Sequence, residues 1–278
     1  MRPKLQQVAE LAGVSEATVS RVMNAKPGVA DATRRRVLDV LSELGYREVP
    51  TKSTGSGVVG IVTPELENPI FPLLAQTIEA RLARHELMSL VCPSTSETVA
   101  EQDYLDHFVE IGAAGVIVVN GRYAQNGVGY DAYQRLIDRG LPVVLVNGIY
   151  PDCPVPAVSI DVRAAAALGV QHLARLGHRR IGCLVGPMRY STSQLFVAGY
   201  EAAMARVNGS ETFTSETLFT LEGGRAGMAP LLEAGYTGVV AAGDVMALGA
   251  IAAVRSWGAE VPEHVSVVGL DGTPMTTL

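Results

Sequence analysis

The sequence predicts an all-α helix-turn-helix head followed by a two-lobed α/β body with parallel sheets. In the first 46 residues, apolar side chains recur at the spacing of short amphipathic helices. From Val58 onward, short runs rich in valine and isoleucine alternate with helical stretches, which is the pattern of strand–helix units on a parallel sheet. Similar runs recur at an offset of 122–124 residues, and a repeat of this length indicates two similar lobes.

Three short helices are expected in the head, residues 1–46. Their buried faces are predicted to be Leu5, Val8, Ala9 and Ala12; then Val19 and Val22, in a helix from about Glu16 to Met23; then Val37, Val40, Leu41 and Leu44. Gly13 can adopt the positive φ of a tight helix-to-helix turn, and Ser15 is a suitable N-cap. A helix of the second one's size fits the major groove of DNA, so the head is predicted to bind DNA.

The body is expected to form two lobes, residues 58–149 and 150–278, joined to the head by a short linker, residues 47–57. The predicted strands are 58–62, 87–91, 115–119 and 143–147 in the first lobe, and 180–185, 217–221, 238–241 and 266–269 in the second. Parallel lobes of this kind bind ligands at the carboxyl ends of their strands. Two facing lobes therefore predict a cleft for a small molecule.

Charge is distributed unevenly along the chain, whose net charge is −6. Residues 1–52 contain nine lysines and arginines against six aspartates and glutamates, a balance of +3. The remainder contains thirteen against twenty-two, a balance of −9. A basic head on an acidic body keeps the attraction to DNA phosphates local and orients the head toward DNA.

Length and composition are those of a globular protein: 278 residues, 48% of them hydrophobic and 18% charged. Because the chain has no 18-residue apolar run and no apolar stretch of a signal peptide, we expect a cytoplasmic protein without membrane association. The three cysteines have no C-x-x-C spacing and an odd count, so buried or free thiols are expected rather than a metal site or a disulfide framework.

The motifs give no support to an enzyme. The glycine-rich segment 223–227 lacks the G-x-G-x-x-G spacing of a dinucleotide site and follows a predicted helix start. The five histidines show no H-x-x-x-H spacing, and nothing resembles a nucleophile elbow or a catalytic triad. We therefore expect no catalytic residues, no cofactor and no metal.

The chain resembles the LacI–GalR family of bacterial transcription regulators. The matching residues are Val8-Ala9, Ala12-Gly13-Val14-Ser15, Thr18-Val19-Ser20-Arg21-Val22, Asn24, Val29, Thr33-Arg34, Val37 and Leu44-Gly45-Tyr46, with further matches through both lobes. The resemblance implies a periplasmic-binding-protein-like sensor that dimerises, a palindromic operator and a small effector, a sugar or a nucleoside. A repressor is the commonest such regulator. The alternatives are a hairpin that only packs against a partner, and a solute-binding protein or enzyme built on the same lobes.

In the head, the resemblance and the helical geometry together give a set of expected DNA contacts: Leu5, Ser15, Glu16, Ala17, Thr18, Ser20, Arg21, Asn24 and Arg34. Arg21 has the fork that suits guanine O6 and N7, and Ala17 can touch a thymine methyl. Glu16 either accepts from a cytosine amine or only favours the helix N-terminus. The hydroxyls and Asn24 suit phosphates. The run 34–36 is either a phosphate contact or a solvated charge cluster.

In the body, polar and aromatic residues near the expected strand ends form the predicted effector site: Asn68, Phe71, Asn120, Asn147, Asp161, Arg189, Asp244 and Asp271. Each polar member is either a ligand contact or a turn former or helix cap. The resemblance favours Asp244 and Asp271, because the family has cleft-facing residues at these places. One departure is Phe196, which stands where relatives often carry a ligand-binding arginine.

Two further departures from the family concern the linker and the C-terminus. The linker is short and contains Pro50 with glycine and serine, which argues against the family's hinge helix and its minor-groove wedge. After Asp271-Gly272 the chain ends within six residues, whereas relatives return to the first lobe. We therefore expect either a fragment or a contracted natural end, with strands 58–62 and 143–146 losing cover on one face.

Overall fold

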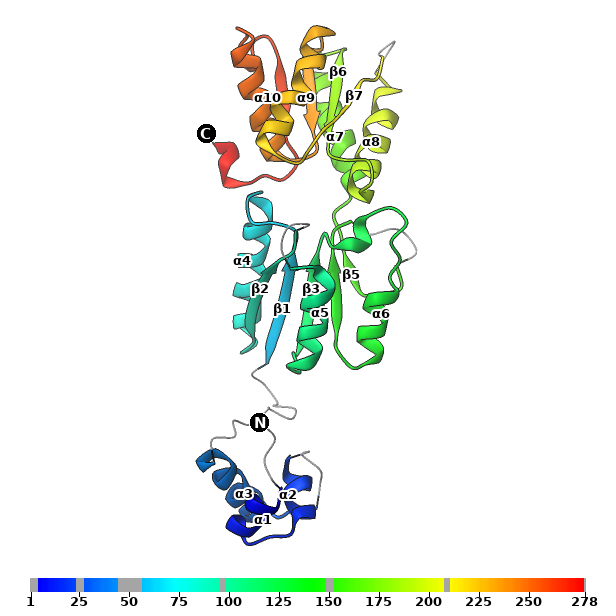
Figure 1. Cartoon of the computed structure of the whole chain (residues 1–278). Coiled ribbons are helices and arrows are strands. Elements are labelled where there is room, and N and C mark those ends of the chain that lie inside the picture. The colour runs from blue at the N-terminus through cyan, green and yellow to red at the C-terminus, as the bar shows by residue number, and fades with distance from the viewer. Residues whose placement is uncertain are drawn as a thin grey trace.

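The computed structural model describes residues 5–23, 28–44, 57–95, 99–148, 153–207 and 211–277. The head consists of α1 (Leu5–Ala12), α2 (Glu16–Met23) and α3 (Asp31–Glu43) (Figure 1). Eight of the ten predicted core residues are buried, Val8, Val19 and Val37 completely, and the other two, Leu5 and Leu44, are half-buried and pack against them. Gly13 makes the turn between α1 and α2 with a φ of +64°. The predicted linker, residues 47–57, lies almost wholly outside the described residues. The prediction that it forms no hinge helix therefore concerns residues that the structure does not describe.

The first lobe is a five-stranded parallel sheet in the order β2-β1-β3-β4-β5. Its strands are β1 (Val58–Thr63), β2 (Met88–Pro93), β3 (Gly115–Val119), β4 (Val143–Val146) and β5 (Ala157–Val158). One face packs on α4 (Ile70–Ala83), and the other packs on α5 (Glu101–Glu110) and α6 (Asp131–Asp138). A short 3-10 helix, η1 (Arg122–Ala124), follows β3.

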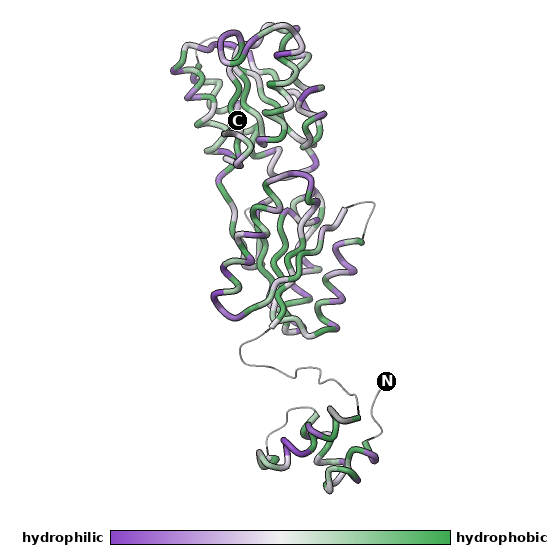
Figure 2. Tube along the Cα trace, turned by 90° about the vertical axis from the view of Figure 1, so that its left-hand side faces the viewer, coloured by the Kyte–Doolittle hydropathy of each residue, from purple (hydrophilic) through white to green (hydrophobic). Residues whose placement is uncertain are grey.

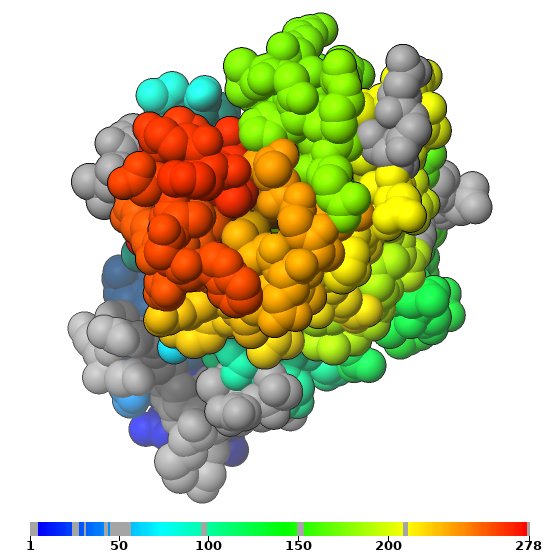
Figure 3. Space-filling view, turned by 90° about the horizontal axis from the view of Figure 1, so that it is seen from above, coloured from blue at the N-terminus to red at the C-terminus, as the bar shows by residue number. Residues whose placement is uncertain are grey.

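The second lobe is a four-stranded parallel sheet in the order β7-β6-β8-β9, with helices on both faces. Its strands are β6 (Ile181–Val185), β7 (Thr214–Glu216), β8 (Gly238–Ala241) and β9 (Ser266–Val268). The helices α7 (Val162–Arg175) and α8 (Ser191–Met204) cover one face; α9 (Leu221–Glu233) and α10 (Asp244–Ser256) cover the other, and η2 (Pro274–Thr277) follows β9. In both lobes the central strands run through the apolar interior between helices with polar outer faces (Figure 2). In Figure 3, the orange and red residues of α10 and the following segment form one side of the second lobe.

Two predictions about the body need correction. The strand expected at 217–221 is Thr214–Glu216 instead, because Thr220 ends the following loop as the N-cap of α9, its hydroxyl accepting from the N–H of Gly223 at 2.9 Å. The boundary expected between residues 149 and 150 lies too early. Strand β5 still belongs to the first sheet, since the N–H of Leu145 donates to the carbonyl of Pro156 at 2.9 Å. The second lobe therefore begins after Val158, with α7.

The expected loss of cover is wrong for β1 and holds only in part for β4. Val59, Ile61 and Val62 are at most 6% exposed, because α4 and α5 close the sheet from opposite sides. In β4, Val144 and Val146 are half-buried. Among the described residues, no helix is long and apolar enough to cross a membrane.

Candidate functional site

A cavity of about 700 Å³ lies at the carboxyl ends of both sheets and is lined by both lobes. The position follows from the topology, since parallel strands leave their loops at one edge and the two edges face each other here. Six of the eight predicted effector residues line it: Asn68, Phe71, Asn120, Asn147, Arg189 and Asp271. The cavity is large enough to enclose a small organic molecule.

On the first lobe, two asparagines end neighbouring strands in a strained backbone conformation. Asn120 follows β3 with a φ of +44°, and Asn147 follows β4 with a φ of +61°. The N–H of Asn120 donates to Val146 O and that of Asn147 to Val158 O, both at 2.9 Å, so hydrogen bonds to the neighbouring strands hold both residues in place. Non-glycine residues with positive φ cost energy and gather at functional sites. Both side chains line the cavity.

Asn68, two residues before α4, and Phe71, in its first turn, are each 8% exposed. The Asn68 side chain accepts from the N–H of Ile70 at 3.4 Å, so it holds the beginning of the helix as well as lining the cavity. Phe71 supplies an apolar wall of the kind that packs on a sugar ring or a base.

Glu101 is a buried member of the wall that no sequence pattern indicated. It is 7% exposed and accepts hydrogen bonds from the hydroxyl of Tyr133 and, at 2.9 Å, from the N–H of Arg122. Burial raises the pKa of Glu101, and these two donors oppose that effect. The Tyr123 hydroxyl, in turn, bonds to Val118 O and Val146 O at the ends of β3 and β4. This network fixes the loop that carries Asn120 and Arg122 into the cavity.

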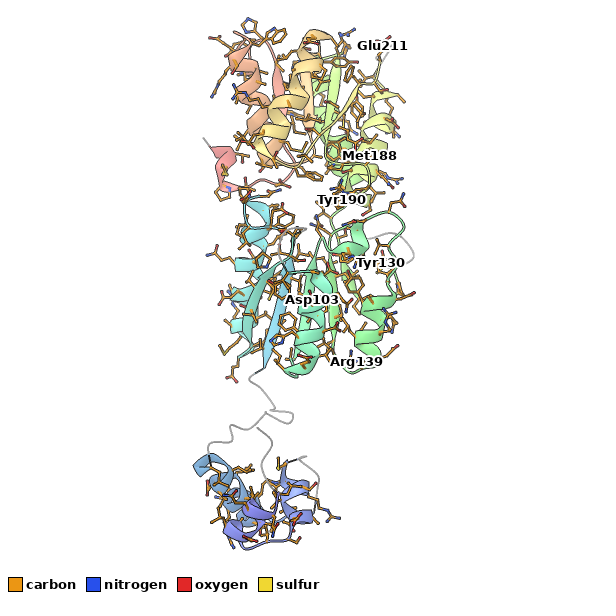
Figure 4. All side chains as sticks on the ribbon, viewed as in Figure 1. Asp103, Tyr130, Arg139, Met188, Tyr190 and Glu211 are labelled. Carbon is orange, nitrogen blue, oxygen red and sulfur yellow. The ribbon has the colours of Figure 1, made fainter. Side chains whose placement is uncertain are left out.

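The second lobe contributes a more aromatic wall. Tyr190, Phe196 and Phe219 line it, and the Arg189 guanidinium lies 4.8 Å from the centre of the Tyr190 ring. The position of Phe196, singled out as a departure from the family, is therefore part of the cavity, and an aromatic ring stands there in place of a cation. Figure 4 shows Tyr190 and Met188 at the level where the two lobes meet.

The two lobes are joined by hydrogen bonds beside the cavity. The N–H of Asn126 donates to the carbonyl of Arg189 at 2.7 Å, and Gln125 pairs with Tyr190 as an antiparallel bridge. The buried hydroxyl of Ser191 donates to the carbonyl of Gly148 at 2.8 Å. The loop that carries Arg189 and Tyr190 is thus held to the first lobe as well as to its own.

The other two predicted effector residues, Asp161 and Asp244, are not among the residues that line the cavity. Asp161 is the N-cap of α7 and accepts from the N–H of Ala164 at 2.9 Å. Asp244 is 2% exposed; its carboxylate accepts from the N–H of Asp271 at 3.0 Å and from the N–H and hydroxyl of Thr273 at 2.6 and 3.0 Å. Its oxygens are occupied in holding the segment after β9, which places Asp271 at the cavity.

The carboxyl of Asp271 has an unusual environment. Burial raises its pKa to about 6 from an ordinary 3.8; the negative charge of Asp244 adds to this, while the N–H of Asp244, donating at 2.8 Å, opposes it. The folded protein therefore binds this proton more tightly than the unfolded chain.

The Asp271→Asn substitution is expected to remove part of the pH dependence of folding. The stabilisation from the protonated carboxyl is complete below pH 3.8 and is lost as the pH rises through about 6. The stability of the wild type relative to Asp271→Asn should therefore fall by about 1–2 kcal/mol between pH 4 and 6.5. Urea unfolding of both proteins across this range measures the difference. Curves of unfolding free energy against pH that run parallel for the two proteins would contradict a raised pKa of Asp271.

In the head, the predicted DNA contacts divide into exposed residues and residues used by the fold. Glu16, Ala17 and Arg21 are exposed on α2. Ser15 is exposed too, but it caps α2: its hydroxyl accepts from the N–H of Thr18 at 3.2 Å and lies 2.9 Å from the Thr18 hydroxyl. Leu5, Ser20 and Arg34 are half-buried, and Leu5 packs on the head core. Asn24 lies outside the described residues.

Comparison with known protein families gives two matches that together span nearly the whole chain. Residues 4–48 match the model described as bacterial regulatory proteins, lacI family. Residues 56–277 match the model described as periplasmic binding proteins and sugar binding domain of LacI family.

Individual relatives agree with these matches. The chain is 44% identical to the HTH-type transcriptional regulator reg1 of Streptomyces lividans and to MalR of Streptomyces coelicolor, in each case over 99% of this chain and 82% of the relative. Among solved structures, a transcriptional regulator CelR–cellobiose complex is 29% identical with a TM-score of 0.66, covering 98% of this chain and 84% of that one. A lac repressor dimer bound to operator and the anti-inducer ONPF is 25% identical with a TM-score of 0.69, covering 100% and 84%.

Proposed function

Because the chain belongs to the LacI family of bacterial regulatory proteins, we propose that it is a cytoplasmic repressor whose affinity for operator DNA is set by a sugar-like effector. It acts as a homodimer on a palindromic site, with one helix-turn-helix head on each half-site. Regulation of transcription through DNA binding is the activity of its named relatives, none of which is an enzyme.

The cavity shared by the two lobes is the observation that carries the proposal. It combines amide and carboxyl side chains and Arg122 on the first lobe with aromatic rings, Arg189 and Asp271 on the second, a set of donors and acceptors beside apolar faces that suits a polar ligand with an apolar face. A structural neighbour solved in complex with cellobiose supports a sugar, and a nucleoside is the alternative.

Coupling to DNA follows from the position of the ligand. An effector that contacts both lobes binds more tightly when they are closed around it, and only such differential affinity shifts a conformational equilibrium. In a dimer, closure changes the spacing of the two heads, which must match one operator. A coupling of about 1–3 kcal/mol is expected, which is about 5- to 150-fold in DNA affinity.

The decisive experiment joins two measurements on the purified chain. Genomic fragments retained by the protein are footprinted, and a protected palindrome of one to two helical turns is expected. Calorimetry against sugars and nucleosides then identifies the effector, which is added to the DNA titration. Binding that is blind to sequence would contradict a regulator; sequence-specific binding that no cavity ligand changes would contradict the effector.

The competing class is a solute-binding protein, which the two lobes alone would support. The folded head, with its predicted core and exposed Arg21, is the observation against it. A ligand bound by the cavity together with no DNA retention at any salt concentration would favour that class instead.

A further inference from the structure

The described part of the chain passes from the first lobe to the second once, through residues 159–161 between β5 and α7. A single covalent connection leaves two lobes free to rotate about it unless other contacts hold them. The direction in which the two halves of the cavity face each other therefore depends on the noncovalent contacts between the lobes.

Those contacts join two short segments and one carbonyl group. Residues 124–126 follow β3 through η1, and residues 189–191 lead into α8. The N–H of Asn126 donates to Arg189 O, and the hydroxyl of Ser191 donates to the carbonyl of Gly148. We call residues 124–126, 148 and 189–191 the inter-lobe junction.

The inter-lobe junction is packed as closely as the core of a lobe. Ala124 is 1% exposed and Ser191 is completely buried. Gly148 has a φ of +67°, and a Cβ on it would lie 2.4 Å from the Cβ of Ala124 and 3.5 Å from Ser191 Oγ. Because this space is closed, water cannot take the place of the Ser191 hydroxyl at the carbonyl of Gly148.

The junction and the covalent crossing lie at the same end of the first sheet. Asn147, next to Gly148, accepts from the N–H of Ile160 at 3.5 Å and donates its own N–H to Val158 O. In the order β2-β1-β3-β4-β5, these contacts follow β3, β4 and β5, whereas other residues of the cavity wall follow β1 and β2 at the opposite end. In Figure 1, η2 and the start of α4 lie on the left, away from α6 and α8.

We propose that the inter-lobe junction is the fixed side of the cavity, that Ser191 is its positioning residue, and that the lobes part at the opposite side, between the loop after β1 and η2. The junction and the covalent crossing are two attachments along one edge, and together they define a hinge axis. The assignment of the cavity to an effector rests on the proposed function, whereas the junction can be tested without an effector.

Amide hydrogen exchange, followed residue by residue by NMR, measures the opening of the junction. The N–H of Asn126 reports the inter-lobe bond. The N–H of Asn120, bonded to Val146 O, and that of Ala242, bonded to Leu184 O, report the first and the second sheet. The test variant is Ser191→Ala. The matched control is Ser193→Ala, because Ser193 is also completely buried in α8, but its hydroxyl has no partner.

In the wild type, the N–H of Asn126 should exchange at least about a hundredfold more slowly than in an unstructured peptide. Ser191→Ala leaves a buried carbonyl without its donor, so exchange at Asn126 should become about tenfold faster, while Asn120 and Ala242 stay within about threefold of the wild type. Ser193→Ala should leave all three rates within about threefold.

The side at which the lobes part is measured by pulsed electron paramagnetic resonance on pairs of nitroxide labels. The half-buried Cys153 is replaced by serine, whereas the other two cysteines are buried. One pair spans the proposed opening and the other spans the junction, all at positions outside the cavity wall: Glu67→Cys with Met275→Cys, and Gly129→Cys with Glu201→Cys. The distance distribution of the first pair should be the broader one, and Ser191→Ala should broaden that of the second pair.

Three results would overturn the inference and leave the proposed function standing. The first is an Asn126 amide that exchanges in the wild type as fast as in a peptide, or no faster in Ser191→Ala than in the wild type. The second is equal acceleration at Asn120, Ala242 and Asn126, which would mean that Ser191 supports the fold as a whole. The third is a distance distribution that is broader across the junction than across the proposed opening.

Discussion

Substitution of Gly249 by alanine is expected to lower the melting temperature of the protein by about 5–15 °C. A Cβ at this position would lie 2.1 Å from the carbonyl oxygen of Leu221 and 2.8 Å from the backbone nitrogen of Arg225. The helices α9 and α10 touch backbone to backbone here, and Gly224 meets Met246 O in the same way. Because no flexible side chain can give way, α10 has to move, at a cost of about 2–4 kcal/mol that outweighs the helix-forming advantage of alanine of about 1 kcal/mol.

The measurement is thermal unfolding followed by circular dichroism, and the matched control is Gly129→Ala. Gly129 has no heavy atom within 4 Å of an added Cβ and no positive φ, so its substitution should change the melting temperature by no more than about 2 °C. A Gly249→Ala protein as stable as the wild type would show that the two helices can separate without loss. The close packing would then not be what holds this face of the second lobe.

The head shows why part of the fold could be predicted from the sequence. Its helices are defined by local patterns: 3.6-residue periodicity, Gly13 at the turn and Ser15 as the cap, and each of these appears in the structure at the expected residue. The central strands could be predicted from the sequence as well, because β1, β3, β6 and β8 are buried runs of mainly β-branched and small residues.

The edge strands β5 and β7 could not be predicted in the same way. The sequence of β7 is Thr-Ser-Glu, with only Ser215 buried, and β5 has two residues, both exposed. An edge strand pairs through its backbone, so its side chains need not be apolar. The nearby segment 217–221 has the composition of a strand. Its last two residues nevertheless belong to α9, because Thr220 is the N-cap of that helix and Leu221 is its first residue.

The cavity residues could be predicted from the sequence where strand ends carry polar residues, as at Asn120 and Asn147. They could not be predicted where the direction of a side chain depends on partners far away in the sequence. Asp244 follows β8 as a ligand-binding residue would, but the N–H groups of Asp271 and Thr273, almost thirty residues later, capture its carboxylate. Glu101 is the converse case: only the folded chain brings it against Tyr133 and Arg122.

These two cases have one physical cause. A carboxylate in a nearly dry site must be hydrogen-bonded, and the donors available are set by tertiary structure. Sequence position could therefore predict which edge of the sheet carries the cavity, but not which acidic residue faces it. On the surface of the head this limitation is absent, because an exposed side chain on a short helix keeps the direction that its position gives it.

Arg21 is such a side chain, and its replacement by alanine is expected to weaken binding to the cognate operator by about 1–3 kcal/mol per contact and to relax the preference at one base pair of each half-site. Arg21 is exposed on α2 next to the buried Val22 and Val19, so the substitution leaves the head core intact. Its guanidinium has the planar fork that matches O6 and N7 of guanine, which is the commonest specific contact in the major groove. Fluorescence anisotropy with the operator and with single-base variants measures both effects.

Arg21→Lys is the matched control, because lysine keeps the positive charge but not the bidentate fork. If Arg21 reads a base, Arg21→Lys should lose nearly as much affinity as Arg21→Ala at the cognate site, and both should bind the base-substituted operator about as well as the wild type does. If Arg21 only contacts phosphate, the lysine variant should recover most of the affinity on every sequence, and the alanine variant should lower the slope of log K against log salt by about one. That second pattern would contradict the assignment of Arg21 as a base-reading residue and transfer specificity to its neighbours Glu16 and Ala17 on the exposed face of α2.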